Sequence, residues 1–201
     1  MVNFRNLDLG YEQCRDLYTA VKSDGENLLT NLKQVYSGLN SHWKGTDATL
    51  HINQLVDIHT AVNVFVADTG NAVAYAAQKI SEVQAVRRAN GSSGAVGEEL
   101  SKLSEHERLT KVEETDEYSC TPEAKNDYEL LVQVCGEFDS FVSTVHEKTE
   151  ELMGNWIDGN ERDKVVKNSS DFESLSDEYK RYLSETKDAL DIAVRNLQQI
   201  M

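Results

Sequence analysis

The chain has 201 residues, of which 35 are acidic and 20 basic, and its formal net charge is −15 at pH 7. A surface this negative repels phosphate backbones and anionic lipids, so nucleic acid is excluded as an expected partner. A single proline and 11 glycines favour long uninterrupted helices over an all-β chain.

The sequence also argues against a signal peptide, a membrane span and a cysteine-based framework. Residues 1–5 carry no apolar run behind a basic stretch, so no Sec-type signal peptide is expected. No stretch approaches the roughly 18 apolar residues of a membrane-spanning helix. Cys14, Cys120 and Cys135 are odd in number and irregularly spaced, which indicates neither a disulfide framework nor a zinc site.

The first long helix is predicted over residues 11–42. Its apolar residues alternate at spacings of three and four, which places them in one stripe facing a partner helix. The stripe consists of Tyr11, Cys14, Tyr18, Val21, Gly25, Leu28, Leu32, Val35, Leu39 and His42. Gly25 has two interpretations: a weak point in the helix, or a close approach by another backbone or a large side chain.

A short corner, His42-Trp43-Lys44-Gly45, follows this helix. Gly45 suits a left-handed residue that ends the helix, and Thr46 or Asp47 suits the cap of the next one. The same alternation of spacings then predicts a second helix over residues 47–88. Because so few residues connect them, the two helices are expected to form an antiparallel hairpin.

Residues 91–121 are acidic and polar and are predicted to link two hairpins, since a stretch of this length is uncommon inside one compact unit. The apolar residues Leu100, Leu103, Leu109 and Val112 favour a short surface helix within the linker.

The second half repeats this plan. Thr121-Pro122-Glu123 predicts the start of a third helix that ends near Leu152. The fourth helix begins either at Asn160 or at the capping-box match that starts at Ser170. Placing Trp43 on Trp156 shifts the chain by 113 positions and superposes the two patterns.

The predicted fold is therefore all-α, with two antiparallel helical hairpins in tandem packed as a four-helix bundle. The predicted divisions are a first hairpin over 1–90, an acidic linker over 91–121 and a second hairpin over 122–201.

A long helix, a Trp-x-Gly corner and a second long helix resemble the WxG family, the early-secreted-antigen-type substrates of bacterial type VII secretion. The first half carries Trp43-Lys44-Gly45 at the corner. The second half departs from the pattern, because Trp156 and Gly159 are separated by one extra residue.

The resemblance implies that the chain is a fused version of a WxG dimer, since family members pair as four-helix bundles. It also implies that Trp43, Gly45, Trp156 and Gly159 form the turns and contribute to recognition by a partner or by the secretion machinery. The Trp43 ring is either partly exposed in a groove or pins the hairpin turn. The expected partner is a WxG-type protein, the helical domain of a toxin, the secretion ATPase or a second copy.

The export signal of the family, Tyr-x-x-x-Asp/Glu, is absent from the sequence. Export is therefore expected to need a partner that carries the signal, or the protein acts as an adaptor. We expect synthesis in the cytoplasm, followed by secretion or surface display through the type VII system.

No pattern of residues indicates catalysis, a cofactor or a metal. His51 and His59 are eight positions apart and lack further ligands at zinc spacing. The Glu-x-x-His pairs of a carboxylate di-metal bundle are missing. The predicted function is a non-enzymatic secretion substrate, co-secreted partner or adaptor; the alternative is a cytosolic helical-bundle scaffold or chaperone unrelated to secretion.

Overall fold

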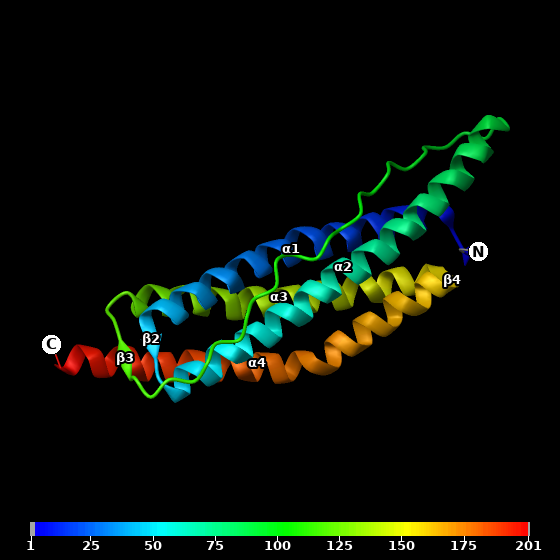
Figure 1. Cartoon of the computed structure of the whole chain (residues 1–201). Helices are drawn as coiled ribbons and strands as arrows, with labels where there is room; N and C mark the ends of the chain where they lie inside the picture. The colour runs from blue at the N-terminus through cyan, green and yellow to red at the C-terminus, as the bar shows by residue number, and fades with distance from the viewer. Residues whose placement is uncertain (1–2, 201) are drawn as a thin grey trace. The chain divides into compact units, whose positions relative to one another are not determined.

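The computed structural model describes residues 3–200, and the side chains of residues 3–197. Four long helices dominate it: α1 (Leu7–His42), α2 (Thr46–Ala89), α3 (Ala124–Asn155) and α4 (Asn160–Ile200) (Figure 1). The all-α class is confirmed, and α4 begins at the earlier of its two predicted starts. Among the described residues, no helix is long and apolar enough to cross a membrane.

The chain forms two compact units, and each takes one segment from every helix. Unit 1 consists of Met1–Glu26, Val64–Glu105 and Phe141–Ser174, and unit 2 of Asn27–Asn63, His106–Ser140 and Leu175–Met201. Within each unit the four helical segments pack against one another as a bundle. The predicted division into 1–90, 91–121 and 122–201 follows the order of the chain, whereas the two units follow spatial contacts. The predicted division is therefore not tested by the units and stays a prediction.

An aromatic cluster forms the core of unit 1. Phe65 of α2 stacks on Phe172 of α4 with ring centroids 4.4 Å apart, and Phe141 of α3 meets both rings edge-on. Gly25 of α1 lies against this cluster, because a Cβ added there would come within 3.4 Å of Phe141 Cε2, and within 2.4 Å of the neighbouring Val66 Cγ2. Gly25 is therefore a site of close side-chain approach, the second of its two interpretations.

The core of unit 2 continues the predicted stripe of α1. Leu28, Leu32, Val35 and Leu39 are all at most 1% exposed. Burial of such side chains stabilises a fold by roughly 1.5–3 kcal/mol each. From α3, Phe138 packs edge-on against Tyr179 of α4, with ring centroids 6.4 Å apart.

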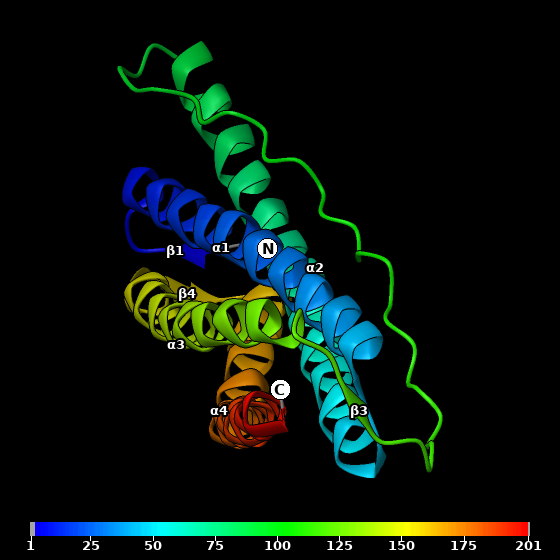
Figure 2. The ribbon, with the colours of Figure 1, turned by 90° about the vertical axis from the view of Figure 1, so that its left-hand side faces the viewer.

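Two very short antiparallel ladders accompany the helices. In unit 1, β1 (Asn3–Phe4) pairs with β4 (Trp156–Asp158), as Figure 2 shows. In unit 2, β2 (Trp43–Lys44) pairs with β3 (Ser119–Cys120). Each ladder therefore joins a tryptophan corner to the residues that precede the first helix of the other hairpin.

The connector between α2 and α3 contains neither helix nor strand over residues 92–118, all of which the structure describes (Figure 1). Within it, every third residue from Gly97 to Thr115 is half-buried and all the others are exposed. The half-buried residues are Gly97, Leu100, Leu103, His106, Leu109, Val112 and Thr115. We call residues 97–115 the strap.

The predicted surface helix in this segment is wrong, and the spacing of its apolar residues explains why. In an α-helix, residues three apart drift by about 60° at each step, so a long run of them cannot share one face. Polyproline II has three residues per turn and keeps every third residue on one side. The burial of the strap follows this second period.

Candidate functional site

The first tryptophan corner lies in unit 2. Gly45 has φ of 125°, a region that side chains disfavour, and its carbonyl accepts a hydrogen bond from Thr49 N at 2.9 Å. Gly45 thus occupies the cap position of α2. The predicted side-chain cap at Thr46 or Asp47 is replaced by this backbone arrangement, with α2 beginning at Thr46.

The Trp43 side chain is 2% exposed and stacks on the ring of His51, with centroids 5.8 Å apart. The expectation of a partly exposed indole is wrong, and the ring pins the turn as the alternative predicted. Backbone pairing reinforces the corner, because Trp43 lies opposite Cys120 and Thr121 N donates to His42 O at 2.9 Å.

A polar pair adjoins this corner. A hydrogen bond of 2.7 Å joins His42 Nδ1 to Asp127 Oδ2, and Asp127 is 9% exposed. Gly38 of α1 makes room for the carboxylate, because a Cβ there would lie 2.0 Å from Asp127 Oδ1. The end of α1 is thus tied to the start of α3 within unit 2.

A cleft of about 380 Å³ opens beside the first corner, within unit 2. Its walls are Asn40, Trp43, Lys44, Thr49, Ile52, Val112, Glu113, Thr115 and Glu117. The indole forms part of one wall while remaining buried. Tyr118, which flanks Gly45, is the prominent exposed aromatic side chain here, at 67%.

The second corner lies in unit 1 and has the same turn. Gly159 has φ of 129°, and its carbonyl accepts a hydrogen bond from Asp163 N at 3.1 Å. Trp156 is 1% exposed and stacks on Phe4, with centroids 5.1 Å apart. Ile157, beside it, is 48% exposed.

An asparagine fastens the second corner to the start of the chain. Arg5 N donates to Asn155 O at 3.0 Å. The Asn155 side chain donates to Asn6 O at 2.8 Å and accepts from Asn6 N at 2.9 Å. Asn6 in turn caps α1, because its Oδ1 accepts from the backbone N–H groups of Asp8 and Leu9.

The structure therefore brings each predicted tryptophan together with its own glycine. Trp43 and Gly45 belong to unit 2, and Trp156 and Gly159 belong to unit 1. Since both rings are buried, any recognition at the corners falls to exposed neighbours such as Tyr118 and Ile157.

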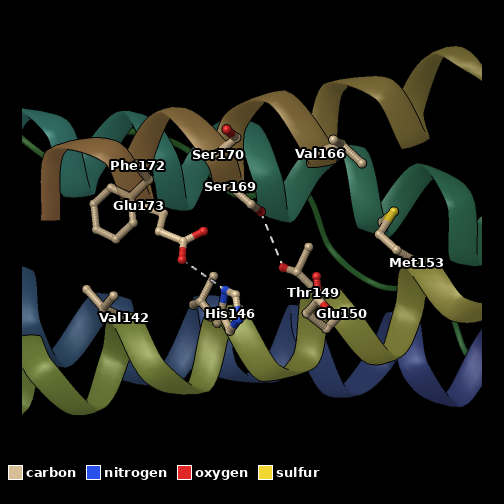
Figure 3. Close-up of a pocket in the computed structure, with 11 residues that line it drawn as sticks. Val142, His146, Thr149, Glu150, Met153, Val166, Ser169, Ser170, Phe172 and Glu173 are labelled. Carbon is tan, nitrogen blue, oxygen red and sulfur yellow. Dashed lines mark hydrogen bonds and ion pairs between the residues drawn. The ribbon is translucent and has the colours of Figure 1, made fainter.

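Unit 1 also holds a cleft of about 160 Å³ between α3 and α4 (Figure 3). Two polar contacts bridge the helices there: His146 Nδ1 lies 3.3 Å from a carboxylate oxygen of Glu173, and Thr149 Oγ1 lies 3.3 Å from Ser169 Oγ. Drug-sized ligands occupy pockets of roughly 300–1,000 Å³, so this cleft does not indicate a small-molecule site.

The reactive groups of the described residues are buried or dispersed. No group of three or more metal-ligating side chains comes together among residues that the structure describes. Burial raises the pKa of the Cys14 thiol far above its usual value, so this cysteine is unreactive. Burial also lowers the pKa of His59 to about 4, with smaller contributions from His106 and Lys33.

Sequence reasoning missed three asparagines on α2 that hold the strap. Asn71 bonds both the N–H and the C=O of Leu103 in unit 1. Asn63 and Asn53 do the same in unit 2, for His106 and Val112 respectively. Two features of the sequence indicate these contacts: the three-residue period of the connector, and the amide side chains that interrupt a long apolar helix.

Comparisons with protein-family models, with curated proteins and with solved structures gave no match for this chain. The functional interpretation therefore rests on the geometry of the two corners.

Proposed function

We propose that the protein is a non-enzymatic, single-chain WxG pseudo-dimer that serves a type VII secretion system as substrate, co-secreted partner or adaptor. The observation that carries this proposal is the shared geometry of the corners. At both, a buried tryptophan directly follows one helix and a glycine with φ near 125–129° directly precedes the next.

The reciprocal strand pairing supports a fused dimer. The segment before α1 pairs with the corner that follows α3, and the segment before α3 pairs with the corner that follows α1. Matching backbone bonds accompany the pairing, from Arg5 N to Asn155 O and from Thr121 N to His42 O. Two subunits of a dimer would exchange such segments in the same manner.

The corners offer two exposed side chains, Tyr118 and Ile157, as contacts for a helical partner or the secretion ATPase. The buried tryptophans hold the two turns rigid. Tyr118 and Ile157 are therefore suitable anchors, because little conformational entropy is lost when a partner binds them. The strongly negative charge favours a partner with a basic surface.

The test is export from the native bacterium. We expect the protein in the culture supernatant or at the cell surface, and its loss from both when the secretion ATPase is deleted. Equal export without the ATPase would overturn the proposal, and retention in the wild-type cell would favour a cytosolic scaffold or chaperone.

A second arm locates the recognised surface. Tyr118→Asp and Ile157→Asp are expected to reduce export severalfold without unfolding the protein, since both side chains are exposed. Val132→Asp on α3, exposed at 45%, is the matched control and is expected to be exported normally.

A further inference from the structure

The strap is bound by side chains that contact its backbone. In unit 1, Tyr11 Oη donates to Glu98 O and Tyr18 Oη to Ser101 O, both at 2.8 Å. In unit 2, Tyr36 Oη donates to Thr110 O at 2.7 Å. Gln84 Oε1 accepts from Gly97 N at 3.1 Å.

The asparagines complete this pattern with paired bonds. Asn71 bonds Leu103 at 2.8 and 2.9 Å, Asn63 bonds His106 at 2.7 and 3.0 Å, and Asn53 bonds Val112 at 2.8 and 3.2 Å. Every residue except proline offers the same backbone N–H and C=O groups. These contacts therefore require an extended conformation of the bound segment but place little restriction on its amino-acid sequence.

The surface selects among side chains only at every third residue of the strap, where the side chain is half-buried. Gly70 of α2 shows how close the fit is in unit 1, because a Cβ there would lie 2.4 Å from Leu103 Cδ1. A Cβ added at Gly97 would likewise lie 2.1 Å from Tyr11 Cε2. The face therefore requires a small residue at the Gly97 position and accepts apolar side chains at Leu100, Leu103, Leu109 and Val112.

The ion pairs of the strap contribute little to its binding. The strap carries six acidic and three basic residues, and the rest of the chain is also strongly negative. Two ion pairs hold it in unit 2, Lys33 with Glu107 and Lys111 with Asp57, and their side chains are 48–79% exposed. Exposed pairs of this kind contribute about 0–1 kcal/mol.

We propose that the strap-contacting faces of α1 and α2 are binding surfaces for extended peptide segments of another protein, which displace the strap. The preferred segment has apolar residues at the positions of Leu100, Leu103, Leu109 and Val112, and neutral or basic residues between the half-buried positions. The strap is then an intramolecular competitor. This inference stands on the strap contacts alone and does not depend on export.

Tethering gives the strap an effective concentration on the order of millimolar, so an incoming segment must bind better or meet a loosened strap. The test therefore uses the full chain in two forms: wild type, and a loosened variant with Leu103→Ser and Val112→Ser. Circular dichroism first establishes that the four helices of the variant are intact.

Three fluorescent peptides serve as probes in an anisotropy titration at low and physiological salt. The first has the sequence of residues 95–116, and the second has its strap glutamates replaced by glutamine. The third is the second peptide with Leu100, Leu103, Leu109 and Val112 replaced by serine.

We expect the glutamine peptide to bind the loosened variant at least tenfold tighter than the native peptide at low salt, with the difference shrinking as salt rises. The serine peptide is expected to bind at least tenfold more weakly than the glutamine peptide. Wild type should bind every peptide more weakly than the loosened variant.

Variants of the clamps test the surface itself. Asn63→Ala and Asn53→Ala, each in the loosened chain, are expected to weaken the glutamine peptide about tenfold, since each loses two backbone hydrogen bonds. Gln133→Ala on α3 is the matched control and should leave the affinity unchanged.

Three results would overturn the proposal. One is equal binding of the serine and glutamine peptides, and another is no binding to a loosened variant whose helices are intact. The third is a concentration-dependent dimer of the loosened variant in light scattering that excludes the peptides, because the occupant would then be the strap of a second copy.

Discussion

The two tryptophan corners are alike in backbone and different in side chains. Both place a buried indole before a glycine of positive φ, and both pair with a strand that precedes a distant helix. At the first, Trp43 stacks on His51, and His42 bonds Asp127. At the second, Trp156 stacks on Phe4.

The features that the two corners share are the ones that define the fold. The turn and the strand pairing are common to both units, so they are the elements that a helical hairpin of this kind requires. The ring partners differ because each need only fill the space over an indole. The extra residue between Trp156 and Gly159 leaves the glycine geometry unchanged, as the two φ values show.

The largest effect should come from the indoles. Trp43→Ala and Trp156→Ala are each expected to lower the free energy of unfolding by about 3–5 kcal/mol, because each removes a fully buried aromatic side chain. Urea denaturation followed by circular dichroism measures the loss. Each variant keeps the other tryptophan as a fluorescence reporter of the other unit, so unchanged fluorescence midpoints would show that the corners act independently. A loss below about 1 kcal/mol would contradict the packing described here.

Acidification should destabilise unit 2 more than unit 1. His59, in unit 2, is neutral when folded down to pH about 4 and protonates near 6.5 when unfolded, so the unfolded state binds more protons between these values. Stability is therefore expected to fall as pH drops from about 6.5 to 4, by at most about 3 kcal/mol from this residue.

The pH effect is measured by urea titrations at several pH values. His59→Gln should flatten the profile over this window, and the flattening should appear in the fluorescence of Trp43. His146→Gln in unit 1, whose side chain is 53% exposed, is the control. An identical slope for His59→Gln and wild type would rule out this source of acid sensitivity.

The corner glycines come next. Gly45→Ala and Gly159→Ala are each expected to cost about 1–3 kcal/mol, because both need a φ that alanine rarely adopts. At Gly45 the added Cβ would also lie 3.1 Å from the Tyr118 ring. Thermal unfolding of the two variants measures the losses.

The control for the glycines is Gly136→Ala in α3, where a Cβ would meet nothing within 4 Å. Helix propensity predicts that this change stabilises the protein by about 0.5–1 kcal/mol. Equal effects at all three glycines would remove the backbone argument for the corners.

The smallest effect should come from the polar ties. Asn155→Ala is expected to cost about 1–2 kcal/mol, because it leaves the N–H and C=O of Asn6 without these partners. His42→Ala should cost less, because its side chain is 32% exposed and water can replace it beside Asp127. Calorimetric melting temperatures compare the two, and the reverse ranking would contradict this distinction.

The sequence predicted the helices well, because a stripe at spacings of three and four is a local property of the chain. The α1 stripe from Cys14 to Leu39 is buried as expected, and Gly25 lies at a close contact. The corners were found for the same reason: Trp43 and Trp156 stand where the stripes end.

The remaining features depend on residues that are distant in the chain. A strand of two residues such as β1 has no recognisable pattern, and its partner β4 lies in the second half of the sequence. The four apolar residues of the strap are compatible with a short helix, and only the three-residue period of the whole segment distinguishes it from one. Asn53, Asn63 and Asn71 bind backbone that is 32–59 positions away in the chain, so no local pattern identifies the segment that they hold.

The junction between Asn6 and Asn155 has a consequence for synthesis. The two residues are 149 positions apart, and the start of α1 is fastened to the second corner only when both are present. At about 5–20 residues per second, a ribosome needs on the order of 7–30 s to reach the second from the first. During that interval Phe4 and the apolar stripe of α1 stay without their final cover. A factor that shields this nascent helix would act in that interval.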